Sequence, residues 1–541
     1  MYVFRDGKRK TSGAELTGAL VNALCRWRMS STGNSEECTL LALIAAGELE
    51  CALLDADEQS HATLAIEITD ALATALLTGE KNSLASALEK AQRIRVHGNY
   101  QVAVQEGFAY YALHPRKVAM LVEELPLAPR VGVVGIRSIG VVLSAVACAA
   151  LRGRGIRCER MTVRPTGHPY NRELEQTQEL RNFAERSKAG EILIVDEGPG
   201  ISGSSFLAVA EAVEACGIAA ERIQMIGSRA IDVCSLRATN ATARWSHYGF
   251  HSMQPAPLVP AEASESLSGG SWRRHFHNQA EPVPATWTAL EPAKFLSRDG
   301  QSLYKFEGLG HYGEELGARA LMLAGRGFSP SYLSSRRGFG CYRMIRGRAL
   351  TWRDLARGAL ERVAEYVAWR GAAMSSTQPQ SAELEKMLRW NWRAEFGDEL
   401  SAEEGRLPVH RPTVCDGRMM PHEWLRSENG RMLKLDAVAH GDNHFFPGPC
   451  DIAWDVAGTI VEWRLPWQAR EAFLDGYERR SGDRVRQRLH PYLLAYTVFQ
   501  LGWCKMAAAA MPGEFDESLL LRDYASYRSV AVELRRRQNA A

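Results

Sequence analysis

A short apolar run that ends in two acids and opens into a loop of glycine and serine limits the fold of this chain more than any other segment. Ile192 to Val195 is continuously apolar, Asp196 and Glu197 follow, and the loop 198–205 leads into the alanine-rich segment 206–216. A fully apolar strand followed by a loop and a helix is typical of a parallel sheet, whose ligands bind at the carboxyl ends of its strands. We therefore expect an α/β domain with a ligand site at this loop.

The segments around the loop repeat the alternation of strand and helix. Expected strands are 131–136, 156–163, 192–195 and 222–226, and expected helices are 141–152 and 206–216. This order predicts a parallel sheet with helices on its faces. The residues before it, to about 120, have the periodicity of helices and are expected to form a helical hood.

The loop suits a pentose phosphate. Its backbone N–H groups and hydroxyls can turn inward, and the N-terminus of the helix that follows favours an anion. Asp196 and Glu197 can accept hydrogen bonds from the vicinal hydroxyls of a ribose. The candidate phosphate and ribose ligands are Gly200, Ser202, Gly203, Ser204 and Ser205.

This stretch resembles the phosphoribosyl pyrophosphate signature of type I phosphoribosyltransferases, in which four apolar residues and two acids precede a loop ending in Thr/Ser-Gly-small-Ser/Thr. The resemblance covers about residues 120–235 and departs in one respect, because 198–201 makes the loop about one residue longer. It implies displacement at the anomeric carbon of phosphoribosyl pyrophosphate, with Mg²⁺ and Arg137 offsetting charge on the pyrophosphate. Asp196 and Glu197 would hold the sugar, and 164–172 would close over the site.

The second half of the chain has a different pattern. Residues 294–306 have the form of a β-hairpin turning at Asp299-Gly300, and Lys305 lies on its second strand. A kinase small lobe places the lysine that pairs with nucleotide phosphates on such a strand. Glu314 and Glu315 open the next helix, so either is a candidate ion-pair partner of Lys305, and Lys305 with Glu315 is the expected ATP-binding pair.

Further on, Asp436 follows a short strand, and Gly441 to Ala457 contains Asp451 and Asp455. This segment resembles the aminoglycoside-phosphotransferase or choline-kinase-like family, in which a metal-binding Asp precedes Gly-Asp-Pro-x-x-Asp-Leu-Ala. The resemblance, over about 292–541, implies an α+β protein-kinase-like half that uses ATP and Mg²⁺. It makes Asp436 the metal ligand, makes Asp451 and Asp455 acids that fix the catalytic loop, and makes Asp416 the base that orients an acceptor hydroxyl.

The departures from this family leave alternatives open. The family has an Asn five residues after the catalytic Asp, whereas this chain has Pro421, His422 and Glu423 near that position. His422 or Glu423 can serve as a metal ligand, with His422 as the expected one, or the substitution marks an inactive kinase. A rival alignment takes His440-Gly-Asp442 as the catalytic motif, but it leaves no metal-binding Asp on a later strand.

The composition excludes several classes of protein. With 65 basic and 63 acidic residues, the charge gives no case for nucleic-acid binding. The eleven cysteines lack the C-x-x-C spacing of zinc sites, which suits reduced thiols in a cytosol. No signal peptide is recognisable at the N-terminus, and the apolar runs are too short to span a bilayer. We expect a cytoplasmic protein with small-molecule substrates and no membrane partner, and homodimerisation is left open.

Together these patterns predict four regions: a helical hood (1–120), a phosphoribosyltransferase-like domain (121–250), a linker rich in Pro and Ser (251–291) and a kinase-like domain (292–541). The expected function is a bifunctional transferase. The alternatives are a regulator or sensor that binds phosphoribosyl pyrophosphate or a nucleotide and carries a degenerate kinase domain, or one active half with the other as a scaffold.

Overall fold

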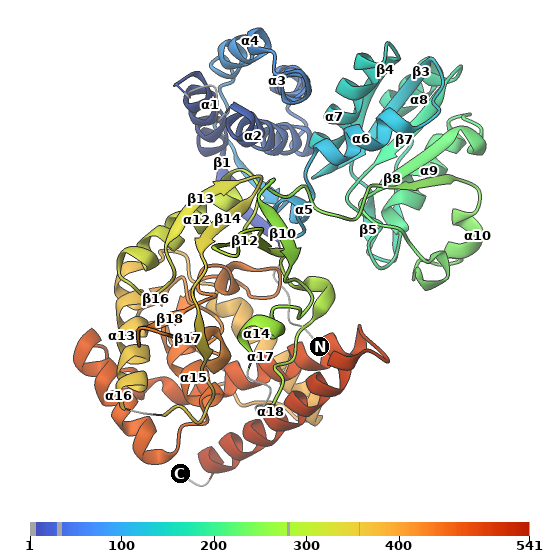
Figure 1. Ribbon diagram of the computed structural model, residues 1–541. Helices are drawn as coiled ribbons and strands as arrows, with labels where there is room; N and C mark the ends of the chain where they lie inside the picture. Colours follow the sequence, from blue (N-terminus) through green and yellow to red (C-terminus); the bar gives the residue numbers. More distant parts are fainter. Residues whose placement is uncertain (1–6, 30–34, 278–281, 356, 540–541) are drawn as a thin grey trace.

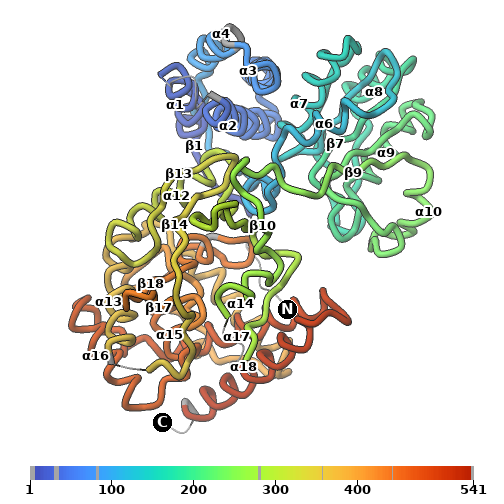
Figure 2. The backbone as a smooth tube through the Cα atoms, viewed as in Figure 1, coloured from blue at the N-terminus to red at the C-terminus, as the bar shows by residue number. Residues whose placement is uncertain are grey.

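The computed structural model describes residues 7–29, 35–277, 282–355 and 357–539. Three parts follow one another along the chain: a group of N-terminal helices, an α/β part and a larger C-terminal part (Figures 1 and 2). None of the described helices combines the length and the apolar composition that crossing a membrane requires.

The predicted parallel sheet is confirmed. Its five strands stand in the order β4-β3-β7-β8-β9, and every neighbouring pair is parallel. The strands are β3 (Arg130–Ile136), β4 (Arg157–Val163), β7 (Glu191–Val195), β8 (Ile223–Gly227) and β9 (Gly249–Ser252), the last of which the sequence analysis did not predict. The helices of this part are α7 (Gly140–Gly153), α8 (Gln178–Ser187), α9 (Ser204–Ala215) and α10 (Ala241–Trp245). An antiparallel hairpin, β5 (Thr166–His168) and β6 (Asn171–Glu173), overlaps the segment 164–172, which was predicted to close over the site.

The central strands are buried because helices cover both faces of the sheet. In β7, four consecutive residues from Ile192 to Val195 are buried. Helix α7 lies so close to β3 that a Cβ on Gly135 would be 2.2 Å from the carbonyl oxygen of Gly140. The glycine at this position therefore sets how closely the helix approaches the sheet.

The N-terminal helices pack against both of the other parts. Their elements are β1 (Lys8–Ser12), α1 (Gly13–Met29), α2 (Ser35–Asp55), α3 (Gln59–Thr78), α4 (Lys81–Ala91), β2 (Asn99–Ala103), α5 (Glu106–Ala109) and α6 (Arg116–Glu124). Arg160 of β4, almost fully buried, donates to Glu50 of α2 at 2.7 and 2.9 Å and to Asp70 of α3. The same hydrophobic core reaches Phe306 and Phe339 in the C-terminal part. The hood is therefore shared between the two halves.

Two sheets form the framework of the C-terminal part. An antiparallel five-stranded sheet has the order β10-β11-β12-β14-β13, and a three-stranded sheet has the order β15-β17-β18. The strands are β10 (Ala263–Ser266), β11 (Lys294–Ser297), β12 (Ser302–Phe306), β13 (Tyr332–Arg336), β14 (Phe339–Arg343), β15 (Gly347–Ala349), β17 (Trp424–Ser427) and β18 (Met432–Lys434), with a short pair β16 (Pro412–Thr413) and β19 (Cys450–Asp451). The predicted hairpin turn is present, with Gly300 at φ +70°.

The segment predicted as a linker contributes to this part of the fold. Within it, β10 pairs with β11, and α11 (Arg273–Phe276) follows. Trp272 stacks on His422 with ring centroids 5.8 Å apart, and Arg273 forms an ion pair with Asp516. The aromatic stretch 272–277 is thus docked on the C-terminal part rather than serving as a spacer.

Helices complete the C-terminal part. They are α12 (His311–Gly325), α13 (Arg357–Ala373), α14 (Ser381–Phe396), α15 (Ala453–Glu462), α16 (Trp467–Ser481), α17 (Leu489–Ala509) and α18 (Phe515–Asn539). Helix α17 is buried along most of its length, and α15, α14 and α18 pack around it. This helical mass supports the loops that carry Asp416 and Asp436.

Candidate active site

A cavity of about 860 Å³ lies where the two sheets of the C-terminal part and the N-terminal helices meet. It is lined from three directions: by β12 and β14, by the segments that precede β17 and follow β18, and by α1 and α2. Apolar and aromatic side chains line it together with charged ones. The apolar group includes Leu303, Met344, Ile345 and Leu435.

Lys305 and Asp436 meet in this cavity. Lys305 is on β12 and Asp436 follows β18, so two different sheets bring them together, and the ammonium of Lys305 donates to Asp436 Oδ1. Burial alone would raise the pKa of Asp436, but Lys305, His440 and Lys294 hold it well below its usual range. The convergence of Lys305 and Asp436, 131 residues apart in the chain, is what the sequence predicted for a nucleotide site.

Glu315 is not brought to Lys305. Its side chain is exposed on α12, although it lines the same cavity, and no ion pair joins it to Lys305. Glu314 pairs with Arg26 of α1 at 2.7 Å. The acid that lies beside Lys305 in sequence and in space is Glu307, which is buried and accepts a hydrogen bond from Tyr342. Burial raises the pKa of Glu307 to about 7, and Lys305 opposes that rise.

Asp416 lies at the floor of the site, in the loop after β16. Its backbone N–H and that of Gly417 donate to the two carboxylate oxygens of Asp455, at 2.8 and 3.0 Å. Asp455 stands in the first turn of α15, where a carboxylate is favoured by the helix N-terminus. Asp451 in turn accepts from the backbone N–H groups of His410 and Arg411, at 2.7 Å each. Two buried acids thus fix the loop that presents Asp416.

The side chain of Asp416 is completely enclosed. Tyr366 donates to its Oδ2, Lys434 lies 3.3 Å from its Oδ1, and Arg370 lies 3.9 Å from Oδ2. Burial would raise the pKa of Asp416, but Lys434, His440 and Arg370 together lower it. His440 Nδ1 is 3.8 Å from Asp416 Oδ1, and His440 lines the cavity. The imidazole therefore stands between the predicted base and the open space.

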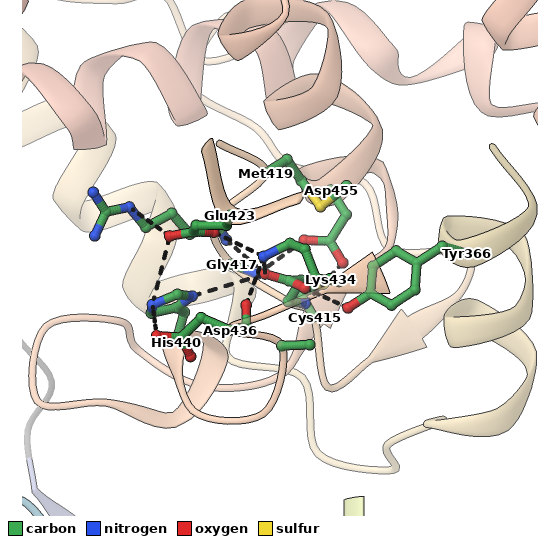
Figure 3. Close-up of polar contacts among 12 residues, drawn as sticks. Tyr366, Cys415, Gly417, Met419, Glu423, Lys434, Asp436, His440 and Asp455 are labelled. Atoms are coloured by element: carbon green, nitrogen blue, oxygen red, sulfur yellow. Dashed lines mark hydrogen bonds and ion pairs between the residues drawn. The ribbon is translucent and has the colours of Figure 1, made fainter. Parts of the chain in front are cut away.

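Glu423, rather than His422, faces the acids of the floor. Lys434 bridges Glu423 Oε2 at 2.7 Å and Asp416, and Figure 3 shows its ammonium at the centre of these contacts. His422 lies stacked on Trp272, and burial together with the nearby Arg418 lowers its pKa. Within the described part of the chain, the group able to hold a metal ion is Asp416, Glu423 and His440. Of the two candidate ligands that the sequence left open, Glu423 belongs to this group and His422 does not.

Sequence reasoning missed Lys434, Arg370 and the place of His440. Lys434 could have been found from the sequence. It lies on a strand, two residues before Asp436, and residues two apart along an extended chain face the same side. His440 belongs to the rival motif His440-Gly-Asp442; the side chain of Asp442 lies outside the described residues. Arg370 gave no signal, since a single arginine in a helical pattern is ordinary.

The second predicted site lies at the carboxyl edge of the parallel sheet. Gly135 of β3 pairs with Val195 of β7, so Arg137 and Asp196 emerge from neighbouring strands at the same edge. Asp196 and Glu197 are half-buried, and Gly107 of α5 donates to Glu197 at 2.8 Å. Burial raises the pKa of Asp196 to about 7, and burial with Glu106 and Asp196 nearby raises the pKa of Glu197 to about 8.

The loop after these acids is closed by the β5–β6 hairpin. The hydroxyls of Ser202 and Ser204 donate to the carbonyl oxygen of Pro169, at 2.8 and 2.7 Å. Gly203 has φ +69°, which turns the chain into α9. Ser205 is half-buried in the first turn of that helix, and Gly200 is exposed.

Arg137 forms its hydrogen bonds with groups other than the two acids. It donates to Asp55 of α2 at 3.0 Å and to the carbonyl oxygen of Thr162 at 3.2 Å. Arg164 binds the same carboxylate at 2.6 and 2.8 Å. The two cations at this edge are thus held by one acid of the N-terminal helices.

Of the comparisons with known proteins, the one with solved structures finds similar proteins. No protein-family model matches the chain, and no curated protein sequence matches it. A choline/ethanolamine kinase family protein from Mesorhizobium loti is 17% identical over 44% of this chain and 84% of its own, with a TM-score of 0.32. A choline kinase from Cryptosporidium parvum is 11% identical over 50% and 96%, with a TM-score of 0.33. An aminoglycoside phosphotransferase from Alicyclobacillus acidocaldarius is 11% identical over 53% and 98%, with a TM-score of 0.32. At these TM-scores the similarity supports no conclusion about function.

Proposed function

We propose that the cleft transfers the γ-phosphoryl group of ATP to a hydroxyl group of a small molecule. The observation that carries this proposal is the meeting of Lys305 and Asp436, from two different sheets, beside the fixed loop of Asp416. A lysine and a metal-binding acid on opposite sides of a cleft are the arrangement by which a triphosphate is gripped.

The cavity offers separate places for the parts of ATP. The apolar side chains of Met344 and Ile345 suit a flat base, and Lys305 lines the same cavity, where a phosphate would displace its contact with Asp436. The volume of about 860 Å³ leaves room for an acceptor as well, since ligand sites commonly range over about 300–1,000 Å³.

The residues present fit a divalent cation bound with the nucleotide. Asp436 offers carboxylate oxygens, the ligand type that Mg²⁺ prefers, and it lines the cavity. Asp436 is therefore the residue that would hold Mg²⁺. When bound, the ion would offset the negative charge of the phosphates.

In the step itself, the oxygen of the acceptor hydroxyl forms a bond to the γ-phosphorus while the bond between this phosphorus and the bridging oxygen of ADP breaks. Lys305 offsets charge on the phosphates. The hydroxyl proton passes to a ring nitrogen of His440, which lines the cavity, and the carboxylate of Asp416, 3.8 Å from His440 Nδ1, stabilises the imidazolium that forms. The products are ADP and the phosphorylated acceptor.

Label transfer tests the proposal. The protein is incubated with Mg²⁺, ATP labelled in the γ-phosphate and a pool of hydroxyl-bearing metabolites, and labelled products are separated. Wild type should transfer label to at least one acceptor, and Asp436→Asn should not. Asp475→Asn is the matched control, because Asp475 forms an ion pair with Arg486 at the surface of α16. Absence of transfer by the wild type would favour the regulatory alternative.

A second candidate function belongs to the edge of the parallel sheet: binding of phosphoribosyl pyrophosphate and transfer of its ribosyl phosphate. The observation that favours it is the adjacency of β3 and β7, which sets Arg137, the two acids and the N-terminus of α9 at one edge. The bond between the anomeric carbon and pyrophosphate would break as a bond to the nucleophile forms. The residues offer carboxylates for the ribose hydroxyls and N–H groups for its phosphate.

Release of pyrophosphate from phosphoribosyl pyrophosphate in the presence of Mg²⁺ and a pool of bases tests the second candidate. Loss of that release in Asp196→Asn, with phosphoryl transfer from ATP retained, would assign the reaction to the sheet edge. Equal release by wild type and Asp196→Asn would contradict it.

A further inference from the structure

The side chain of Lys434 is a feature of the cleft floor that the proposed reaction does not use. It is fully buried at the end of β18. Its ammonium donates to Glu423 Oε2 at 2.7 Å, to the carbonyl oxygen of Asp436 at 2.6 Å and to Asp416 Oδ1 at 3.3 Å. An ammonium has three N–H donors, so all of them are engaged with oxygens of the site.

Two of these oxygens belong to the group that would otherwise bind a cation. The ligand atoms of Asp416, Glu423 and His440 lie within 4.8 Å of one another, and Lys434 Nζ contacts the first two. A divalent ion placed between Asp416 and Glu423 would stand against the ammonium at contact distance. Like charges this close repel strongly where water is excluded. The ammonium thus occupies the position that a bridging ion would take.

Asp436 has different surroundings. Lys305 contacts its Oδ1, while His440 and Lys294 are 3.6 and 4.0 Å from its Oδ2. Lys305 is a mobile partner in the proposed reaction, because phosphate oxygens would draw it away. A divalent cation can therefore take the place of the Lys305 ammonium at Asp436.

We propose that Lys434 is a built-in cation that takes the place of a second metal ion, so that the nucleotide binds with a single divalent cation. This inference rests on the proposed phosphoryl transfer. Phosphoryl transfer needs positive charge on more than one side of the triphosphate. Here one charge arrives with the nucleotide at Asp436, and the other is fixed by the fold beside Asp416 and Glu423. Lys434 is a positioning residue, since it acts through these two carboxylates.

The number of ions bound with the nucleotide tests this directly. Mn²⁺ binding is followed by electron paramagnetic resonance, with a non-hydrolysable ATP analogue present and absent. Wild type should bind one analogue-dependent Mn²⁺ per chain, and Lys434→Met should bind two. Lys434→Met/Glu423→Gln should return to one, because a ligand of the new position is removed. Lys505→Met is the control and should bind one, because Lys505 pairs with Glu395 outside the cavity.

A measurement on the wild type alone covers the case in which Lys434→Met fails to fold. Affinity for the analogue is measured over a series of Mn²⁺ concentrations, and the slope of log affinity against log free Mn²⁺ gives the number of ions taken up. A slope of one supports the inference. A slope of two, or two bound ions in wild type, overturns it while leaving the phosphoryl-transfer proposal standing. No analogue-dependent Mn²⁺ in wild type would overturn both.

Discussion

The floor of the cleft and the edge of the parallel sheet both gather buried or half-buried acids, but the charges of these acids are balanced in different ways. In the cleft, Asp416 and Asp436 are paired with the ammonium groups of Lys434 and Lys305. At the sheet edge, neither Asp196 nor Glu197 forms an ion pair with any residue that the structure describes. The pKa values diverge accordingly: those of the cleft acids are lowered, and those of Asp196 and Glu197 are raised to about 7 and about 8.

In the cleft, cations of the fold balance Asp416 and Asp436 before any ligand binds. At the sheet edge, the acids have no paired cation among the described residues. The cleft keeps Asp416 and Asp436 ionised through cations belonging to the fold, so the geometry of these two acids is ready before a nucleotide arrives. At the sheet edge Arg137 and Arg164 form ion pairs with Asp55 instead, while Arg164 opposes the rise in the pKa of Asp196 and Arg229 that of Glu197 only in part. A ligand there has to bring hydrogen-bond donors to the acids and an anion to the arginines.

The largest expected effect is on catalysis in the cleft. Lys305→Met removes the cation that faces the phosphates, and kcat/KM for ATP should fall by about 10²–10³-fold. Steady-state kinetics with the acceptor identified by label transfer measure the change. Release of pyrophosphate at the sheet edge should be unaffected. A loss below threefold would mean that Lys305 only balances Asp436.

The next largest effect is on the free energy of unfolding, which should differ between the loss of an arginine in the cleft and the loss of an arginine at the sheet edge. Arg370 is buried and donates to Tyr366 and to the carbonyl oxygens of Val414, Cys415 and Ala437. Arg370→Leu should lower the free energy of unfolding by about 3–5 kcal/mol, because it leaves buried acids and carbonyls without a partner. Arg137→Leu should cost less than about 1 kcal/mol, since its partner Asp55 is partly exposed. Denaturant titration of both variants measures the difference, and equal losses would contradict the contrast.

A smaller effect should appear in the pH dependence of stability. The pKa values of Asp196 and Glu197 lie near 7 and 8 in the folded chain, above the ordinary 3.8 and 4.5 of the unfolded chain. Between these limits the folded chain holds protons that the unfolded chain has lost, so stability falls as pH rises from about 4.5 to about 8. The slope is at most about 1.4 kcal/mol per pH unit for each group.

Asp196→Asn/Glu197→Gln should flatten this part of the curve and stabilise the chain at pH 8. Denaturant titrations at pH 5, 6, 7 and 8 on wild type and the double variant provide the check. Parallel curves would show that other groups set the pH dependence.

The smallest effect is expected where the two regions touch. Glu106 of α5 lies 3.4 Å from His444, and the neighbouring Gly107 donates to Glu197. Because the Glu106–His444 pair is partly exposed, Glu106→Gln should change stability by less than about 0.5 kcal/mol and phosphoryl transfer by less than twofold. A tenfold change in phosphoryl transfer would instead indicate that the sheet edge and the cleft are coupled through α5.

The sequence predicted the parts of the fold that follow from local pattern. Continuous apolar runs such as 192–195 and the turn at Asp299-Gly300 are local signals, and the structure has a strand and a hairpin there. Strand β10 was not predicted, because Ala-Ser-Glu-Ser has a loop-like composition and is a strand only through its pairing with β11. The sharing of the hood between both halves depends on long-range packing that no local pattern specifies.

The sequence indicated which acids and which lysine of the candidate site lie together. It did not indicate which cations balance the charge of those acids. Lys305 could be named from its position on a strand, and Asp436 from the resemblance of its segment to a known family. The choice between His422 and Glu423 could not, because adjacent residues in a short turn point in different directions and only the turn's packing decides. Nothing in the local pattern indicated that Arg137, expected to bind pyrophosphate, also contacts Asp55, 82 residues away in the chain.

Binding of ATP, measured by isothermal titration calorimetry with Mg²⁺ and with EDTA, tests most directly the claim that the charges of the cleft converge on a metal-bound triphosphate. The account predicts binding to wild type that weakens at least about tenfold without Mg²⁺, and that this dependence on Mg²⁺ disappears in Asp436→Asn. Absence of binding to wild type, or binding equally tight with and without Mg²⁺ and in Asp436→Asn, would contradict it.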